Sequence, residues 1–278
     1  MLIGTALRDT AEQLTPVLAD FALPYSERIL QYLTGCSRNE LYLSTERQLG
    51  SDRAQQLVRI VKRCETGEPL DYILGTTYFF NREFIVTPDV LLPRPDTELL
   101  VEVVLKHQTK SSAIFAEIGI GSGIISCILT ERMPEWQAVG VDISKRALDV
   151  AKRNRQSNRV QLVCSDCLYG LAKENRYDFI ISNPPYIASV EMINLDTSVT
   201  AFEPTVALNG GVDGLAFYRR FAEEVSDYLK PGGVLYCEIG YDQKESVQKL
   251  FERPEWCDFH CFHDLAGHPR VIRIRLRK

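Results

Sequence analysis

The sequence lacks both long apolar runs and an excess of positive charge. None of its apolar runs approaches the roughly 18 residues of a membrane-spanning helix, so we expect no membrane segment. The formal net charge is −5, which argues against a protein whose affinity comes mainly from neutralising phosphates, although a local basic face remains possible. We therefore expect no direct requirement for nucleic acid.

The chain also begins without the basic-then-apolar segment of a secretory signal. Its eight cysteines are scattered along the chain, at positions 36, 64, 127, 164, 167, 237, 257 and 261. This distribution predicts a cytoplasmic protein whose thiols are reduced.

Two cysteine-containing stretches could suggest other chemistry. Cys164 and Cys167 have the Cys-x-x-Cys spacing of redox proteins, but we expect them on a cofactor loop and not at the start of a thioredoxin-like helix. The second stretch could suggest a zinc site, because it contains Cys257, His260, Cys261, His263 and His268. Because these residues straddle an alternating strand that would send side chains to opposite faces, we expect no metal site.

Length and composition favour one large domain and one smaller domain, since 278 residues exceed the usual single-domain size and 45% are apolar. The helical spacing of apolar residues predicts a small helical domain at residues 1–75. Residues 76–97 form a predicted linker that contains a β-hairpin, with Asn81 and Arg82 in its turn. Residues 98–278 form the predicted main domain.

The end of this linker, Leu92 to Glu98, breaks regular structure twice with proline before a helix begins. Asp96 or Thr97 could cap that helix. Two interpretations stay open: the stretch is simply a domain boundary, or Arg94, held between two prolines, faces the cleft between the domains.

Strands and helices alternate from residue 98 onward, which predicts an α/β domain with a mainly parallel sheet covered on both faces. The predicted strands are Ala113 to Ile118, Gln137 to Asp142, Val160 to Val163, Tyr177 to Ser182, Val234 to Ile239, Cys257 to His263 and Val271 to Leu276. The apolar stripe of the helix after Asp213 continues to Leu229, and Pro231-Gly232-Gly233 is expected to end that helix. The alternating Arg273, Arg275 and Arg277 are most simply explained by a strand protected against edge-to-edge pairing, with a basic partner-contact face as the alternative.

The tetrapeptide Asn183-Pro184-Pro185-Tyr186 organises this domain. It follows the apolar run Tyr177 to Ser182, and its prolines stop the strand. The result is a stiff loop at the carboxyl end of a strand, which is the edge where open α/β sheets bind ligands. Asn183 and the neighbouring backbone carbonyls are hydrogen-bond acceptors, and such a cluster suits an NH2 group.

A glycine-rich turn, Glu117 to Gly123, follows the first strand of the predicted sheet. Its glycines permit a tight turn and a close approach to a ligand. The spacing is Gly-x-Gly-x-Gly, not the dinucleotide pattern Gly-x-Gly-x-x-Gly, and an acidic residue precedes it. Asp142 ends the next strand, where a carboxylate can accept both ribose hydroxyls. Asp166 and Cys167 follow the third strand at the level of an adenine ring, although Asp166 could instead be a loop cap.

Together these features favour S-adenosylmethionine over NAD as the cofactor. Glu117 could bind the cofactor's ammonium group. The glycine-rich turn has no phosphate-binding lysine, and a ligand without phosphate requires none.

The sequence resembles the HemK-type protein-(glutamine-N5) methyltransferases, which modify class I peptide-chain release factors. The matching stretches run nearly from end to end and are Gly67 to Gly75, Leu92 to Glu98, Glu117 to Gly123, Asn183 to Ile187, Glu203-Pro204, Ala207-Leu208, Gly210 to Leu215 and Glu238 to Gly240. The Asn-Pro-Pro-Tyr loop also occurs in other amino-methyltransferases, including DNA adenine enzymes. The Pro-Arg-Pro-Asp-Thr-Glu stretch together with the helical leader is far more specific.

This resemblance implies a class I, Rossmann-like methyltransferase domain with a seven-stranded, mainly parallel sheet, and a helical domain that helps to recognise the release factor. The methyl acceptor would be the glutamine of the factor's Gly-Gly-Gln loop, and we expect the enzyme to act as a monomer. Carried over by position, the cofactor contacts are Gly119, Ile120, Gly121, Ser122, Gly123, Asp142, Cys167 and Asn183, and the glutamine pocket is Asn183, Pro184, Pro185 and Tyr186. Cys167 is smaller than the side chain that relatives often carry near the adenine, and Glu117 replaces the commoner aspartate.

A carboxamide nitrogen is a poor nucleophile because its lone pair is delocalised into the carbonyl group. We expect the Asn183 side-chain oxygen and the Pro184 carbonyl to accept one N–H each and to orient that nitrogen, while Tyr186 packs on the flat amide. A direct displacement would then need neither a covalent enzyme intermediate nor a dedicated general base.

Two other functions stay open. An exocyclic amine of adenine or guanine in nucleic acid presents the same NH2 group, but the acidic composition and the lack of a basic, aromatic-rich recognition segment argue against it. A non-catalytic binding module on a decayed methyltransferase scaffold is the second alternative. The intact cofactor loops and acceptor tetrapeptide argue against such decay.

Overall fold

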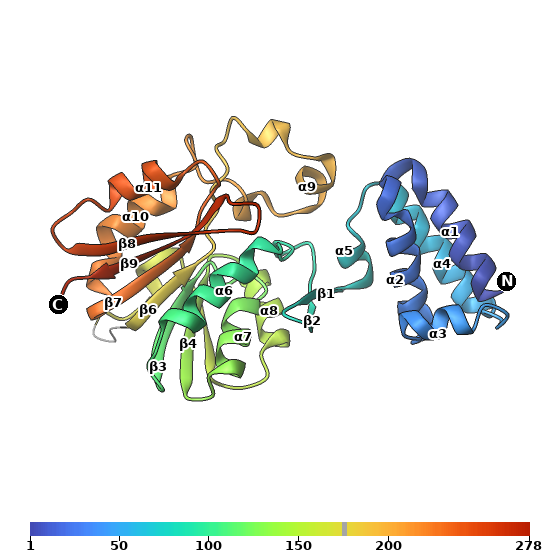
Figure 1. Ribbon diagram of the computed structural model, residues 1–278, viewed down its shortest axis with the longest axis horizontal. Coiled ribbons are helices and arrows are strands. Elements are labelled where there is room, and N and C mark those ends of the chain that lie inside the picture. Colours follow the sequence, from blue (N-terminus) through green and yellow to red (C-terminus); the bar gives the residue numbers. More distant parts are fainter. Residues whose placement is uncertain (174–176) are drawn as a thin grey trace. The chain divides into compact units, whose positions relative to one another are not determined.

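The computed structural model describes residues 1–173 and 177–278. They form two compact units, shown with their elements in Figure 1. The first unit comprises Met1–Thr76 together with Thr197–Phe202, and the second comprises Thr77–Asp196 together with Glu203–Lys278.

The first unit is helical, as the apolar spacing predicts. Its elements are α1 (Ile3–Leu18), η1 (Ala19–Phe21), α2 (Ala22–Thr34), α3 (Arg38–Leu43), α4 (Ser51–Glu65), α5 (Leu70–Leu74) and, from the later segment, α9 (Thr197–Phe202). Helices α1 to α5 bury one common apolar core that includes Leu14, Leu30 and Leu41, each 0% exposed. Ser37 and Glu40 form a reciprocal capping box at the start of α3, which satisfies backbone N–H groups that the helix leaves unpaired.

A two-stranded hairpin follows, built from β1 (Thr76–Phe79) and β2 (Arg82–Ile85). The prediction of Asn81 and Arg82 as its turn is wrong by one residue. Phe80 and Asn81 form the turn, with φ of 51° and 57°, and two positive φ values are what a two-residue type I′ turn requires. The Phe80 N–H donates to Glu98 Oε1 at 2.8 Å, and the Phe80 ring contacts the ring of Phe79.

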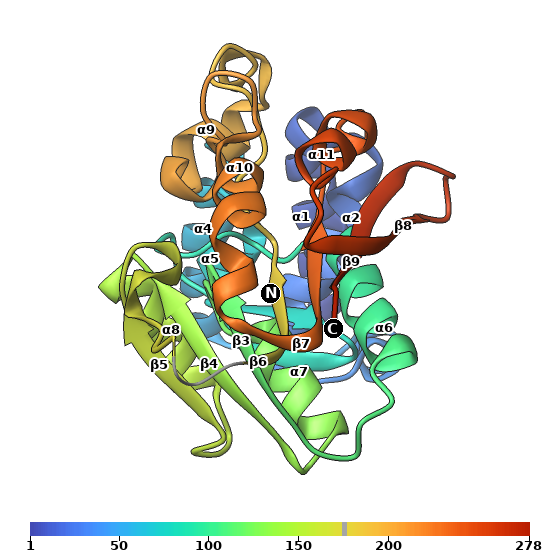
Figure 2. The same ribbon diagram turned by 90° about the vertical axis from the view of Figure 1, so that its left-hand side faces the viewer.

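The second unit contains a seven-stranded sheet, and this confirms the predicted fold class. Its strands are β3 (Ala113–Ile118), β4 (Trp136–Asp142), β5 (Val160–Cys164), β6 (Tyr177–Ser182), β7 (Leu229–Glu238), β8 (Trp256–His263) and β9 (Pro269–Leu276). The order across the sheet is β5-β4-β3-β6-β7-β9-β8, as Figure 2 shows. The strands from β5 to β7 are parallel, and β9 is antiparallel to both of its neighbours.

Helices cover both faces of this sheet. One face carries α6 (Asp96–His107), α7 (Ile124–Arg132) and α8 (Lys145–Asn154), and the other carries α10 (Ala216–Glu224) and α11 (Lys244–Leu250). Side chains alternate between the faces, so Phe115 and Phe179 join the first core while Ala116 and Ile180 join the second. Among its described residues, the unit also contains four short 3₁₀ turns: η2 (Cys167–Gly170), η3 (Met192–Asn194), η4 (Thr205–Ala207) and η5 (Val225–Asp227).

Three further local predictions are wrong. Pro231-Gly232-Gly233 lies inside β7 and does not end the preceding helix, because α10 stops at Glu224 and η5 already turns the chain. Asp96 and Thr97 do not cap α6, since they are its first two residues after Pro95.

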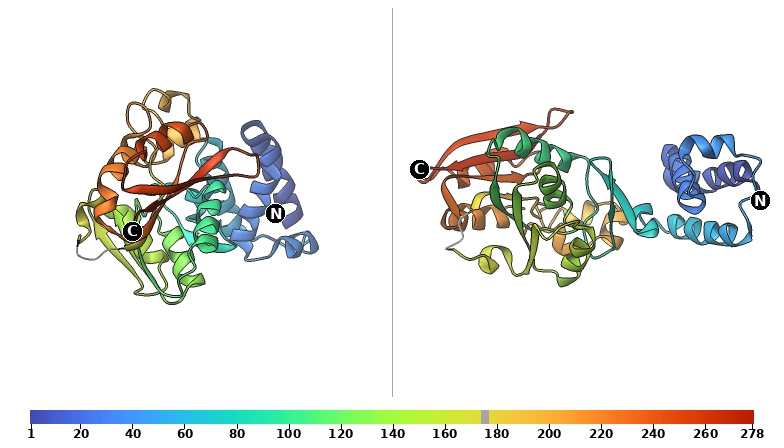
Figure 3. Two further views of the ribbon diagram at one scale, coloured as in Figure 1. Left: turned by 60° about the vertical axis from the view of Figure 1, so that its left-hand side comes forward. Right: turned by 90° about the horizontal axis from the view of Figure 1, so that it is seen from below.

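The third error concerns the arginine-bearing strand β9, which is not at an edge of the sheet. It lies between β7 and β8, and the two red strands of Figure 3 are β8 and β9. Arg273 Nη1 lies 3.0 Å and Arg275 Nε 3.4 Å from Asp258 Oδ2 on β8. The alternating arginines therefore pair with a neighbouring strand.

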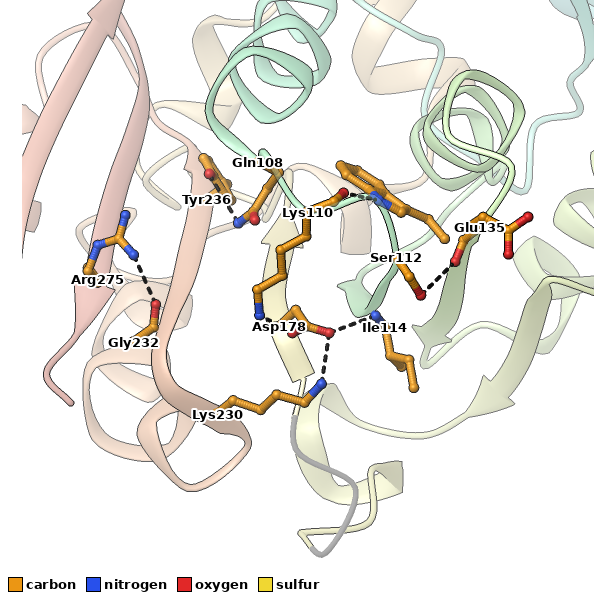
Figure 4. A network of polar contacts seen from close by, with 11 residues as sticks. Gln108, Lys110, Ser112, Ile114, Glu135, Asp178, Lys230, Gly232, Tyr236 and Arg275 are labelled. Carbon is orange, nitrogen blue, oxygen red and sulfur yellow. Dashed lines mark hydrogen bonds and ion pairs between the residues drawn. The ribbon is translucent and has the colours of Figure 1, made fainter.

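A buried carboxylate fixes the amino-terminal end of the central strand β6 (Figure 4). Asp178 has a side chain only 4% exposed, and its two oxygens receive Lys110 Nζ at 2.5 Å and Lys230 Nζ at 2.9 Å. It also accepts the backbone N–H of Ile114 at 2.9 Å, which ties β6 to β3. Burial alone would raise the pKa of Asp178, but these three donors outweigh it and hold the pKa below its usual value of 3.8.

Asp178→Asn is expected to lower the free energy of unfolding at pH 7 by about 1–2 kcal/mol, because it removes a charged acceptor from three donors. The depressed pKa means that the charge contributes stability above the unfolded-state value near 3.8, and that this contribution is lost as pH falls through the lower folded-state value. Urea unfolding of both proteins at pH 7 and at acidic pH tests this. Asp149→Asn, on the exposed side of α8, is the matched control and should change stability by less than about 0.5 kcal/mol. An Asp178→Asn protein as stable as the wild type at pH 7 would contradict the prediction.

Candidate active site

The carboxyl ends of β3, β4 and β6 meet at one edge of the sheet. In the parallel register, Ile118 of β3 lies beside Val141 of β4 and Ser182 of β6. The loops that follow these three strands therefore begin side by side. They line one pocket, together with Asp89 to Arg94, Thr97 and the segment near Pro204.

The glycine-rich turn is held against β4 by backbone hydrogen bonds. The N–H groups of Gly119 and Ile120 both donate to the carbonyl of Val141, at 2.8 and 3.0 Å. Ile120 can lie over β4 because residue 140 is glycine: a Cβ there would be 2.0 Å from Ile120 Cδ1. Gly121 has φ of 53°, and a Cβ on it would meet nothing within 4 Å, so its bare backbone borders open space.

Asp142 is fixed at the end of β4 by two backbone donors. Its Oδ2 accepts the N–H of Gly121 at 2.9 Å, and its Oδ1 accepts the N–H of Ser144 at 2.8 Å. Burial raises the pKa of this carboxyl, and the backbone N–H groups of Ser144 and Gly121 oppose that effect. Each oxygen keeps a further lone pair, so the carboxylate can still accept hydrogen bonds from a ligand in the pocket.

Glu117 is a buried carboxyl that lines the same pocket and is 1% exposed. Its Oε2 accepts the backbone N–H of Ser126 at 2.9 Å and also the Ser126 hydroxyl. Burial is the main cause that raises the pKa of Glu117 to about 8, and the Asp142 charge adds to it. A cationic group placed beside Glu117 would favour the ionised form, so the site is suited to a ligand ammonium.

Asp166 and Cys167 follow β5 and also line the pocket. Asp166 Oδ1 accepts Arg220 Nη1 of α10 at 2.8 Å, which fixes the carboxylate from outside the loop. Cys167 is 6% exposed, and burial raises the pKa of its thiol to about 11, so the thiol stays neutral near pH 7. Cys164 is exposed, and both cysteines are free thiols.

The Asn-Pro-Pro-Tyr loop contributes Asn183 and Pro185 to the pocket lining. Asn183 Nδ2 donates to Thr97 Oγ1 at 3.2 Å. Pro184 is buried, and the Tyr186 hydroxyl lies 3.5 Å from Glu238 Oε1. Gln243 Nε2 donates to the Tyr186 carbonyl at 2.9 Å, so the loop is held at both ends.

The structure thus gathers most of the predicted site residues around one pocket. Those in its lining are Glu117, Gly119, Ile120, Gly121, Ser122, Asp142, Asp166, Cys167, Asn183 and Pro185. Gly123, Pro184 and Tyr186 lie next to lining residues in the chain but are not part of the lining. Their roles in binding and catalysis stay predictions.

Sequence reasoning did not assign Thr97 or Glu203 to this site. Thr97 is in the lining, and Glu203 accepts Arg94 Nη2 at 2.5 Å and the Leu92 N–H at 3.2 Å. Glu203 has a side chain 2% exposed, so this pair joins the segment before Pro204 to the Pro-Arg-Pro loop. Arg94 itself lines the pocket of the second unit. The partners are 109 residues apart in the chain, and no local pattern links them.

Neither a metal cluster nor a membrane helix occurs in the described part of the chain. Within residues 1–173 and 177–278, His, Cys, Asp and Glu form no group of three or more that could hold a metal ion. The same residues include no helix with the length and apolarity needed to span a bilayer.

Comparison with known proteins gives the family. A family model described as PrmC N-terminal domain matches residues 5–75, and one described as methyltransferase small domain matches residues 95–201. A crystal structure of a methyltransferase from Pyrococcus furiosus covers 82% of this chain and 99% of its own at 18% identity, with a TM-score of 0.54. That likeness supports the methyltransferase fold.

Sequence relatives are more specific. A Geobacter sulfurreducens protein named release factor glutamine methyltransferase is 37% identical over 252 residues, which cover 90% of this chain and 88% of the relative. A Streptococcus pneumoniae protein of the same name is 35% identical over 228 residues, which cover 81% of each chain. Because this identity extends over both units, the chain belongs to the release factor glutamine methyltransferase family.

Proposed function

We propose that this protein transfers a methyl group from S-adenosylmethionine to the side-chain amide nitrogen, N5, of the glutamine in the Gly-Gly-Gln loop of class I peptide-chain release factors, and so supports translation termination. One observation carries the proposal: Asn183 lines the same pocket as Glu117, Gly121 and Asp142. The acceptor loop and the cofactor loops therefore share one space.

The pocket residues fit this cofactor by their chemistry. The buried Glu117 suits an ammonium group, Asp142 suits ribose hydroxyls, and Asp166 and Cys167 offer a polar and an apolar contact for an adenine. The turn from Gly119 to Gly123 would lie against the cofactor through its backbone. S-adenosylmethionine, when bound, supplies an electrophilic methyl group on a sulfonium.

The substrate amide would be held by the Asn-Pro-Pro-Tyr loop. The Asn183 Oδ1 and the Pro184 carbonyl would accept one N–H each, which fixes the direction of the amide nitrogen's lone pair. These acceptors bind more strongly as the nitrogen gains positive charge, so they favour the transition state over the ground state. Tyr186 would offer a ring face to the flat amide. No residue of the enzyme needs to form a covalent bond with the substrate. The methylated amide cation is strongly acidic, so it can lose its proton after the transfer.

The remaining parts of the proposal concern partners and domains. Residues 1–75 would help to recognise the release factor, residues 76–97 would serve as a linker, and residues 98–278 would perform catalysis. The enzyme would act as a monomer in the cytoplasm, without a direct requirement for nucleic acid. The formal net charge of −5 supports a protein partner over a polyanionic one.

Mass spectrometry of release-factor peptides after incubation with enzyme and cofactor tests the substrate. The glutamine of the Gly-Gly-Gln peptide should gain one methyl group, and parallel incubations with RNA and DNA should stay unlabelled. Methylation found only in nucleic acid would overturn the proposal. Calorimetry that detects no S-adenosylmethionine binding would instead indicate a non-catalytic binding module.

Asn183→Ala should reduce kcat about a hundredfold or more, because it removes one acceptor for the substrate amide. The melting temperature and cofactor affinity should stay close to those of the wild type. Asn158→Ala is the matched control, since Asn158 is exposed and precedes β5 at the opposite edge of the sheet. Turnover by Asn183→Ala equal to that of the control would show that the amide is held elsewhere.

Gly121→Ala should weaken S-adenosylmethionine binding about tenfold. The added Cβ would occupy pocket space that the cofactor needs, and alanine is strained at the positive φ of this position. Isothermal titration calorimetry measures the dissociation constant directly. Gly267→Ala introduces a comparable strain, at φ of 85° and with nothing within 4 Å of its Cβ, outside the pocket lining. Equal affinities for both variants would refute a role for Gly121 in cofactor binding.

A further inference from the structure

A buried carboxamide behind the glycine-rich turn has no role in the mechanism above. Asn154 is the last residue of α8, is 6% exposed and lies outside the pocket lining. Its Nδ2 donates to the carbonyl of Ser122 at 2.9 Å and to the carbonyl of Ile85 at 2.8 Å, and its Oδ1 accepts the Ile85 N–H at 2.8 Å. A side-chain amide has two N–H donors, and both are used here. These contacts therefore fix the orientation of the Asn154 amide.

The Asn154 amide joins α8 to the β1–β2 hairpin. It bonds both backbone groups of Ile85, the last residue of β2, as a neighbouring strand would. Arg82, the first residue of β2, adds a second link, since its Nη2 donates to the Asn154 carbonyl at 2.9 Å. Its Nη1 lies 2.8 Å from Glu131 Oε2 of α7. Both ends of β2 are thus bonded to the end of α8, which lies beside the hairpin in Figure 1.

The same helix also packs against the glycine-rich turn. Gly119, Gly121 and Gly123 have φ of 72°, 53° and 79°, and glycine loses more conformational freedom than other residues when it becomes ordered. A Cβ on Gly123 would lie 3.1 Å from the Cβ of Ala151 in α8, so the turn and the helix approach closely. Ser122, between two of these glycines, lines the pocket and is bonded through its carbonyl to α8. The helix therefore holds the turn in one conformation from the side away from the pocket.

We propose that Asn154 is a positioning residue for the glycine-rich turn, and that it couples cofactor binding to the β1–β2 hairpin. A turn that is already held in place binds a ligand more tightly, because less ordering has to accompany binding. Without the amide, the Ser122 carbonyl and the backbone of Ile85 would lose these partners, so the turn and β2 would both loosen. Coupling between two sites is reciprocal, so a cofactor bound at the turn should stabilise the hairpin. The inference rests on one part of the proposed function, that S-adenosylmethionine binds at this turn.

Isothermal titration calorimetry of the full-length protein tests the positioning role. Asn154→Ala should weaken S-adenosylmethionine binding about tenfold. Its kcat at saturating cofactor should stay within about threefold of the wild type, because the Asn-Pro-Pro-Tyr loop is unchanged. A residue needed only for folding would lower the melting temperature and leave the dissociation constant as it is. Asn154→Ala with wild-type cofactor affinity would overturn the inference.

Gln108→Ala is the matched control for this variant. Gln108 is another buried side-chain amide next to a helix end, directly after α6, and its Nε2 donates to the Tyr236 hydroxyl at 3.3 Å. It lies outside the pocket lining. Gln108→Ala should lower the melting temperature without changing the dissociation constant of S-adenosylmethionine. An equal loss of affinity in both variants would reduce the effect of Asn154 to general destabilisation and contradict the inference.

Arg82→Ala tests the coupling from the hairpin and decides the matter even if Asn154→Ala does not fold. Arg82 lies outside the pocket lining, so any effect on the cofactor must pass through α8 or α7. The variant should weaken S-adenosylmethionine binding about threefold. Glu83→Ala, at the exposed neighbouring position of β2, is the control and should bind as the wild type does. Equal affinities of these two variants would refute the coupling.

Hydrogen exchange at the Ile85 amide measures the reciprocal effect. Its N–H is bonded to Asn154 Oδ1 and exchanges when that contact opens. Saturation with S-adenosylmethionine should slow this exchange about tenfold in the wild type and leave it unchanged in Asn154→Ala. The Ile114 N–H, which donates to Asp178 at the start of β3, is the control for a general effect of the cofactor and should slow less. An Ile85 exchange rate that is insensitive to the cofactor in the wild type would overturn the inference.

These outcomes separate the inference from the proposed function. A protein that binds S-adenosylmethionine and shows these effects, but leaves release factors unmodified, would defeat the proposed function and support the role of Asn154. A protein that methylates release factors and shows none of these effects would support the proposed function and defeat the inference.

Discussion

The hydrogen-bonded register of the parallel strands is the constraint on which the site depends. Ile118, Val141 and Ser182 are aligned across β3, β4 and β6, so the loops after these strands start at one level. A slip of one residue in β3 would exchange the two faces of that strand and turn Glu117 away from the position that it now shares with the glycine-rich turn. The pairing of the strands therefore determines where the side chains of the site lie.

Two buried carboxyls flank the central strand β6 at this edge, and their environments differ. Glu117 on β3 lines the pocket and is bonded by Ser126, while Glu238 on β7 lies behind the acceptor loop and outside the pocket lining. Burial raises the pKa of both carboxyls. Glu117 borders the space of the pocket, whereas Glu238 lies near the Tyr186 hydroxyl.

Much of the fold follows from local patterns, because strand composition, helical spacing and glycine or proline signals are properties of short segments. The strand Tyr177–Ser182 and the proline-stopped loop after it are examples. The errors arose where tertiary pairing decides. Pro231-Gly232-Gly233 continues into β7 because β6 and β9 pair with that strand. Arg273 is inside the sheet because its strand, β9, pairs with both β7 and β8. Thr97 lines the pocket for the same reason, because its partner Asn183 is 86 residues away in the sequence and no local pattern connects them.

The reversed direction of β9 has a practical consequence for handling the protein. Because Glu238 pairs with Val271 and Val234 pairs with Arg275, β9 starts at the edge of the sheet that carries the pocket and runs away from it. Lys278 accordingly ends beside Gly232, at the opposite rim of the sheet. An affinity tag or fluorophore attached to the carboxyl terminus would extend from that rim and leave the mouth of the pocket unobstructed.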